Sequence, residues 1–147
     1  MPTARPLLVV VTGPSGAGKD SVLARMRSLG RPYHFAVNAT TRAPRETEVE
    51  GVDYYFVSED RFREMVEKGE LLEHAVVYGQ HKGVPKGPVI QALRSGKDVI
   101  VRADVQGARY IKSVAPGAVT IFVTAPSLPD LERRLTGRAT DSPQQIE

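Results

Sequence analysis

The chain has 147 residues, of which 41% are hydrophobic and 25% charged, the balance of an ordinary soluble domain with one core. It contains no cysteine, which excludes disulfides and thiolate metal sites and fits a reducing cytoplasm. A net charge of +3 is too small to indicate nucleic-acid binding, and the apolar run Leu7–Val11 is too short for a signal peptide or a membrane span. We therefore expect a cytoplasmic protein, monomer or homodimer, that binds neither nucleic acid nor membrane.

The first predicted element is a strand over residues 7–11, because an unbroken β-branched run is typical of a strand buried on both faces of a parallel sheet. Apolar residues at helical spacing predict a helix over 22–29, which Gly30 ends. A glycine-rich loop lies between the two elements. Its glycines let backbone N–H groups turn toward phosphate oxygens, the helix adds its positive N-terminus, and Lys19 adds a mobile charge. We predict that a nucleoside triphosphate binds here, on Gly13, Pro14, Ser15, Gly16, Ala17, Gly18, Lys19, Asp20 and Ser21.

Asp20 departs from the phosphate-loop motif, which has Ser or Thr directly after the lysine to hold Mg²⁺. A carboxylate is itself a good Mg²⁺ ligand, and the hydroxyl of Ser21 follows it. Asp20 and Ser21 are therefore candidate ligands of a Mg²⁺ ion bound with the nucleotide. The alternative is that Asp20 only favours the first turn of the helix as an acid near its N-terminus.

Residues 38–52 are polar and basic and are expected to form a functional loop. The run 53–57 predicts a strand, after which Ser58 is the expected N-cap of a helix that ends near Gly69. Residues 71–78 predict the next strand.

In the second half, Pro88 can open a helix that Gly96 closes. Residues 99–101 and 119–123 predict two more buried strands, and Ser127 can cap a last helix. The alternation of strands and helices predicts an α/β fold with a parallel sheet flanked by helices. Ligands of such sheets gather at the C-terminal ends of the strands, where the glycine-rich loop falls.

Arg42 and Arg45 share one loop and can both reach a single phosphate, which guanidinium groups match in geometry. This arrangement suits the phosphate of a second, acceptor nucleotide. The alternative is a basic surface loop in which these arginines pair with Glu46 and Glu48.

Four blocks of sequence, in order and at matching spacing, resemble the guanylate kinase family: residues 40–45, 50–57, 69–75 and 104–108. The resemblance runs from Leu7 to the end of the chain. It implies a P-loop NTPase fold with a core (1–37 and 88–135), an inserted GMP-binding subdomain (38–87) and a partial lid (136–147). The family continues with another strand and a closing helix, so we expect a chain shorter than its relatives.

The resemblance implies an enzyme that phosphorylates GMP to GDP with ATP and Mg²⁺. It implies GMP binding by Asn38, Arg42, Arg45, Tyr54, Glu73, Lys82 and Asp104. It implies catalytic roles for Lys19 and Arg42 and for two arginines leading into the lid, Arg134 and Arg138.

Glu73 is the candidate reader of the base, because one carboxylate can accept both adjacent N–H donors of guanine, a pair that adenine lacks. For Glu73, Asp104 and the two lid arginines, the alternative is an ordinary structural role without a ligand. Glu73 can be a solvated acid at a strand start, and Asp104 can cap a helix that starts near Gln106. Arg134 and Arg138, four residues apart, can belong to an exposed helix end.

Besides Asp20, four positions depart from the family pattern. Lys82 and Val84 stand where relatives have Tyr and Ser or Thr, Asn38 replaces a serine that contacts the base, and Arg102 replaces an acid. Ribose bisphosphate phosphokinases, which have the same fold, resemble this chain in the Lys-Asp-Ser of the phosphate loop and are the second interpretation. A non-catalytic guanylate-kinase-like binding module is the third interpretation. Such modules have typically lost the phosphate loop, which this chain retains, so this interpretation is disfavoured.

Overall fold

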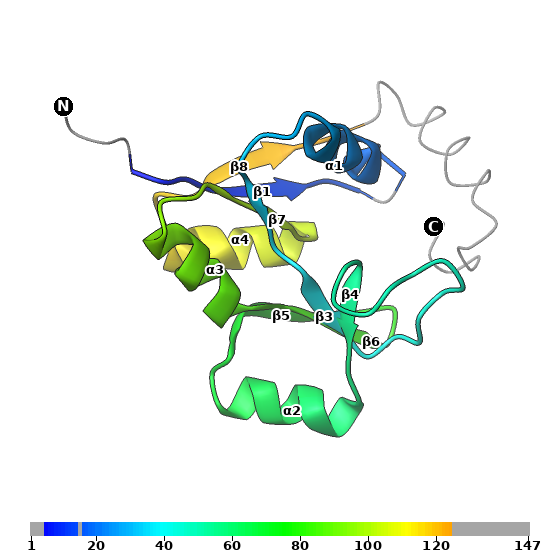
Figure 1. Cartoon of the computed structure of the whole chain (residues 1–147). Helices are drawn as coiled ribbons and strands as arrows, with labels where there is room; N and C mark the ends of the chain where they lie inside the picture. Colours follow the sequence, from blue (N-terminus) through cyan, green and yellow to red (C-terminus); the bar gives the residue numbers. More distant parts are fainter. Residues whose placement is uncertain (1–4, 15, 125–147) are drawn as a thin grey trace.

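The computed structural model describes residues 5–14 and 16–124, which form two sheets and four helices (Figure 1). The elements in chain order are β1 (Leu8–Thr12), α1 (Lys19–Ser28), β2 (His34–Phe35), β3 (Asn38–Thr40), β4 (Tyr54–Phe56), α2 (Glu59–Glu67), β5 (Leu71–Val77), β6 (Gln80–Pro85), α3 (Lys86–Arg94), β7 (Val99–Arg102), α4 (Val105–Val114) and β8 (Val119–Phe122).

The core sheet has the strand order β2-β7-β1-β8, and all its pairs are parallel. Helices cover both faces (Figure 1). Val10 packs with α3 and α4 on one face, while Val11, its neighbour, packs with Leu23 of α1 on the other. Successive strand residues point to opposite faces, so this pattern confirms that β1 is buried on both sides.

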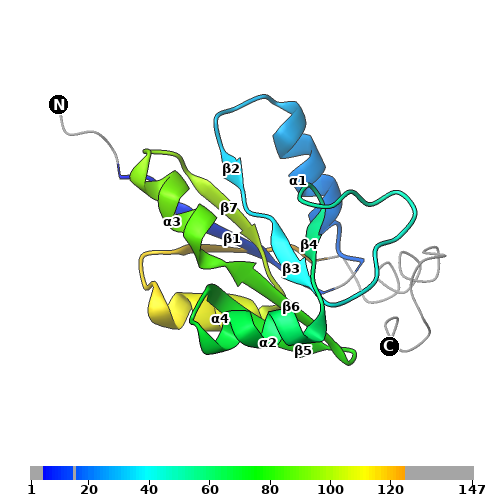
Figure 2. The same cartoon turned by 60° about the horizontal axis from the view of Figure 1, so that its bottom comes forward.

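The second sheet has the order β4-β3-β6-β5 and lies beside the core, with α2 against it (Figure 2). It mixes a parallel pair, β3 with β4, with antiparallel pairs of β6 on β3 and β5. Ala39, Phe62, Met65 and Leu71 form its small core. The sheet lies within residues 38–85, a stretch that also carries every acceptor candidate except Asp104.

Two helix starts follow from local side-chain chemistry. Ser58 caps α2 by accepting a hydrogen bond from the Arg61 backbone N–H at 3.0 Å, as expected. Asp104 caps α4, where its Oδ1 accepts from the Gly107 N–H at 2.7 Å. The turn after β7 is thereby pinned at the edge where ligands are expected.

The structure corrects several expected elements. Residues 38–40 form β3 inside the second sheet rather than the start of a loop, and β2 and β6 were not expected. These strands are short or polar, and pairing with neighbours distant in sequence decides them. Helix α3 begins at Lys86, and Pro88 lies in its first turn, where a backbone N–H has no intrahelical partner.

The expected burial of residues 119–123 was wrong for β8, whose four residues are all exposed. β8 lies at the edge of the core sheet in the described part, paired only with β1. The expected helix capped by Ser127 lies outside the described residues.

Candidate active site

The phosphate loop leaves the C-terminal end of β1 and enters α1. Gly13, Gly16 and Gly18 have φ angles of 143°, 79° and 105°, which side chains disfavour. A Cβ atom on Gly13 would lie 2.0 Å from the Val123 carbonyl oxygen, so the loop also needs glycine for space. Lys19 donates from Nζ to the Gly13 carbonyl oxygen at 2.7 Å. Ser15 lies outside the described residues.

Lys19 lies near charges of both signs, with Arg102 and Lys82 on one side of the balance and Asp20 and Asp104 on the other. Burial lowers the pKa of its amine, and the nearby guanidinium of Arg102 lowers it further. A loop turned by positive-φ glycines, followed by a helix N-terminus and one lysine charge, is the kind of site that a polyphosphate needs.

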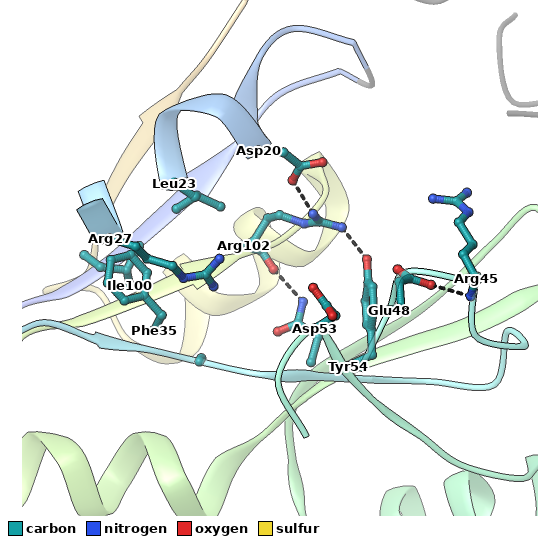
Figure 3. A pocket seen from close by; sticks show the side chains of 12 residues that line it. Asp20, Leu23, Arg27, Phe35, Arg45, Glu48, Asp53, Tyr54, Ile100 and Arg102 are labelled. Atoms are coloured by element: carbon teal, nitrogen blue, oxygen red, sulfur yellow. Dashed lines mark hydrogen bonds and ion pairs between the residues drawn. The ribbon is translucent and has the colours of Figure 1, made fainter. Parts of the chain in front are cut away.

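Asp20 lies in the first turn of α1, with its side chain 63% exposed and its carboxylate paired with Arg102 (Figure 3). Ser21, next to it, is exposed. Carboxylate and hydroxyl oxygens beside the loop lysine fit the chemistry of a Mg²⁺ ion bound with a nucleotide. Residues 5–14 and 16–124 hold no cluster of three or more Asp, Glu, His or Cys side chains that could bind a metal alone. The nucleotide's phosphates and water would have to complete the coordination.

The loop after β3 holds Arg42 through a bidentate ion pair. Its two terminal nitrogens donate to Glu48 Oε1 and Oε2 at 2.8 and 2.9 Å, and Glu48 Oε1 also accepts from the Arg45 backbone N–H at 2.8 Å. Hydrogen bonding from Arg42 lowers the pKa of Glu48 to about 2. The alternative pairing with Glu48 is thus what the structure shows for Arg42. Because Glu48 contacts both Arg42 and the backbone of Arg45, it also holds the two arginines together in one loop.

Tyr54 links this loop to the core sheet. Tyr54 is 8% exposed, and the Arg42 guanidinium lies 5.2 Å from the centroid of its ring. Its hydroxyl accepts a hydrogen bond from Arg102, which stands at the C-terminal end of β7. Arg102 and Glu48 were not among the predicted site residues. The only signal for Arg102 in the sequence was its departure from the family pattern.

Glu73, on β5, is 5% exposed, and its Oε2 has no hydrogen-bond partner in the part of the chain that the structure describes. Burial, and then the charge of Asp104, raise the pKa of its carboxyl to about 7. A Cβ atom on Gly107 of α4 would lie 2.7 Å from Oε2. Glu73 is thus a buried acceptor pressed against the first turn of α4, not a solvated acid at a strand start.

The remaining acceptor candidates have other partners as well. Asp104 is the N-cap of α4, which confirms the alternative of a capping role. Its charge also raises the pKa of Glu73. Asn38 donates from Nδ2 to the Arg102 carbonyl oxygen at 2.7 Å, while its Oδ1 has no partner among the described residues. Burial lowers the pKa of Lys82, and Arg102 lowers it further.

Val84, which stands where relatives have Ser or Thr, is fully buried and belongs to the main core with Val10 and Val99. It lies opposite Glu73 in the β5–β6 register. A valine there packs the core but offers Glu73 no hydrogen bond. Arg134 and Arg138 lie outside the described residues.

No helix in residues 5–14 and 16–124 is long and apolar enough to cross a bilayer. The parallel core sheet, with a glycine-rich loop between its first strand and a helix, defines a P-loop NTPase fold.

Comparison with known proteins gives the family. The guanylate kinase family model matches residues 5–147. The chain is 45% identical over 141 residues to guanylate kinase of Clostridioides difficile, covering 96% of this chain and 69% of that one. It is 46% identical over 139 residues to guanylate kinase of Thermosynechococcus vestitus, covering 95% and 73%.

A solved structure agrees with the sequence matches. The crystal structure of guanylate kinase from Anaplasma phagocytophilum superposes with a TM-score of 0.75 at 32% identity, covering 88% of this chain and 65% of that one. The chain belongs to the guanylate kinase family. It spans about two thirds to three quarters of the length of these relatives.

Proposed function

We propose that this protein is an enzyme, a nucleoside monophosphate kinase that transfers a phosphoryl group from ATP to GMP and forms ADP and GDP. The observation that carries the proposal is Glu73: a 5% exposed carboxylate with an unpartnered oxygen among the described residues. An unsatisfied buried acceptor is costly, and the two N–H donors on the pairing edge of guanine would satisfy it. Family membership supports the same reaction.

The donor side is the phosphate loop, residues 13–21. Its N–H groups and the N-terminus of α1 would bind the triphosphate, and Lys19 would exchange its contact with the Gly13 carbonyl for the outer phosphates. Asp20 or Ser21 would hold Mg²⁺, which when bound neutralises charge on the phosphates.

The acceptor side is the second sheet and its loop, and we propose residues 38–87 as an insert in a core of residues 1–37 and 88–135. Arg42, Arg45 and Tyr54 would hold the acceptor phosphate, with Lys82 as a further cation. Glu48 orients the first two through the contacts given above. Glu73, Asp104 and Asn38 would contact the nucleoside.

In the transfer step, an anionic oxygen of the acceptor phosphate attacks the terminal phosphorus of ATP. The bond from that phosphorus to the bridging oxygen breaks, and ADP leaves with the electron pair. The attacking oxygen carries no proton, so no general base is needed. Catalysis is positioning and charge stabilisation by the loop and the arginines. We propose that Arg134 and Arg138 in a lid, residues 136–147 included, add charge over the reacting phosphates. The protein would work in the cytoplasm, in keeping with its lack of cysteine.

The test is acceptor specificity. ADP formation is measured with Mg·ATP and GMP, dGMP, AMP or ribose bisphosphate offered separately. We expect turnover with GMP and at least about a hundredfold less with AMP, because AMP would leave Glu73 unsatisfied. Lys19→Ala is the control for transfer through the phosphate loop and should lose turnover while the protein stays folded. Turnover with ribose bisphosphate alone would replace this proposal by the second interpretation.

A further inference from the structure

Arg102 occupies the junction between the donor loop and the acceptor sheet. Its NH1 contacts Asp20 Oδ1 in the first turn of α1, and its NH2 contacts the Tyr54 hydroxyl of β4. Figure 3 shows the guanidinium between these two partners. One side chain thus touches both a residue next to the phosphate-loop lysine and a residue of the second sheet.

The position of Arg102 is fixed from its backbone outward. Arg102 is the last residue of β7 and pairs with Val11 of β1, directly before the phosphate loop. Its carbonyl oxygen accepts from Asn38 at 2.7 Å, which ties β7 to β3. The stem is therefore anchored where the two sheets meet.

The guanidinium remains able to bind an anion. The group has five N–H donors, and its two contacts leave others for phosphate oxygens. Its side chain is 34% exposed, and Asp20, Tyr54 and Arg102 line a pocket of about 300 Å³. Arg102 is close enough to cations on both sides to affect them: its charge lowers the pKa of Lys19 on the donor side and of Lys82 on the acceptor side.

Asp20 explains how such a cation is kept in place. Without an anion nearby, Arg102, Lys19 and Lys82 repel one another, and the carboxylate of Asp20 offsets part of that repulsion. Asp20 stands where the phosphate-loop motif has Ser or Thr. The carboxylate of Asp20 is thus paired with Arg102, a residue outside the phosphate-loop motif.

We propose that Arg102 is a phosphate-binding residue of the transfer reaction, contacting the acceptor phosphate beside Tyr54 and the terminal donor phosphate beside Lys19, with Asp20 as its counter-ion. The inference rests on the proposed function. It assigns to Arg102 the task of holding the two reacting groups together, at the place where negative charge is concentrated during transfer.

The experiment compares Arg102→Met, which keeps the apolar stem, with Arg102→Lys and with Arg27→Met as matched control. Arg27 lines the same pocket but lies over the Phe35 ring. We expect Arg102→Met to lower kcat about a hundredfold and to weaken GMP binding, measured by calorimetry without ATP or metal, about tenfold. Arg102→Lys should recover part of both, and Arg27→Met should change neither by more than about twofold. Thermal unfolding verifies that each variant folds.

The same substitution in an Asp20→Asn background separates two roles. If Arg102 binds phosphate, Arg102→Met still lowers kcat and GMP binding there. If Arg102 only neutralises Asp20, the substitution has no effect in that background, and the proposal is overturned. Folded Arg102→Met with wild-type kcat and GMP affinity overturns it as well. Absence of GMP turnover in the wild-type protein would refute the proposed function instead, so the two failures are distinguishable.

Discussion

Glu73 carries a carboxylate that the protein buries without a partner within the described residues, and its pKa of about 7 follows from that burial and from the charge of Asp104. Near neutral pH the ligand-free site is therefore a mixture of acid and carboxylate. Only the carboxylate accepts both N–H donors of guanine. Under the proposed function, this raised pKa would make GMP binding sensitive to pH near neutrality.

We predict that GMP binding strengthens about tenfold between pH 6 and pH 8, since Glu73 changes from mostly protonated to mostly ionised over that interval. Isothermal calorimetry across this range measures the effect. The phosphate of GMP itself titrates near pH 6, so Glu73→Gln is the control: it should bind GMP more weakly and show only the phosphate's shallower response. An identical pH profile in Glu73→Gln would show that Glu73 does not read the base.

The same ionisation affects stability, with a definite sign. The folded pKa of Glu73 lies above its unfolded value, so its contribution to stability is full below about pH 4.5 and is lost as the pH rises through about 7. Glu73→Gln should therefore gain stability relative to wild type at pH 8 compared with pH 5. The gain is on the order of 3 kcal/mol at most.

Helix α4 meets strand β5 at the site, and one glycine sets their distance. Gly107 lies in the first turn of α4, donates its N–H to Asp104, and leaves room for the Glu73 carboxylate. A side chain at this position would push Glu73 away from its place or move the helix. The contact between the two elements thus determines where the Glu73 carboxylate, the proposed reader of the base, lies.

We predict that Gly107→Ala raises the KM for GMP about tenfold or more while ATP binding changes little, because the new methyl group would lie 2.7 Å from Glu73 Oε2. Steady-state kinetics with each substrate varied in turn measures the split. Gly87→Ala is the matched control, since Gly87 lies in the first turn of α3 with no atom within 4 Å of its added Cβ. If both variants keep the wild-type KM for GMP, Gly107 does not position Glu73.

At the scale of the whole molecule, the second sheet lies beside the core sheet, and both contribute cations near their junction. Lys19 comes from the core, Arg42 and Lys82 from the second sheet, and Arg102 from the junction. Lys82 is partly buried among these guanidinium groups, and burial and their charges lower its pKa. Mutual repulsion of these cations opposes folding, and an anion bound beside them would relieve that repulsion.

We predict that Lys82→Met raises the free energy of unfolding by about 1 kcal/mol, because it removes a half-buried charge next to other cations. The same change should weaken GMP binding. Thermal unfolding and GMP calorimetry measure the two effects, with the exposed Lys97→Met as control. A loss of stability in Lys82→Met would mean that its stem packing outweighs the charge repulsion.

The sequence by itself determined the features that are encoded over a few neighbouring residues. The run before Gly13 predicted β1, the glycines and Lys19 predicted the turn and the charge, and Ser58 predicted the start of α2, because strand periodicity, positive φ angles and capping depend on local spacing. The clustered Arg42 and Arg45 were visible for the same reason.

The tertiary structure alone decided what depends on distant residues. Asp20 and Arg102 are 82 positions apart, and no local pattern brings them together. The burial of Val84 and of the Glu73 carboxylate arises from packing of the second sheet against the core. Strands β2 and β3 are short and β6 begins with polar residues, so all three depend on pairing with strands distant in sequence. The phosphate loop could be predicted from the sequence because it depends on neighbouring residues. The position of Arg102 could not, because it depends on burial and on charges from residues distant in sequence.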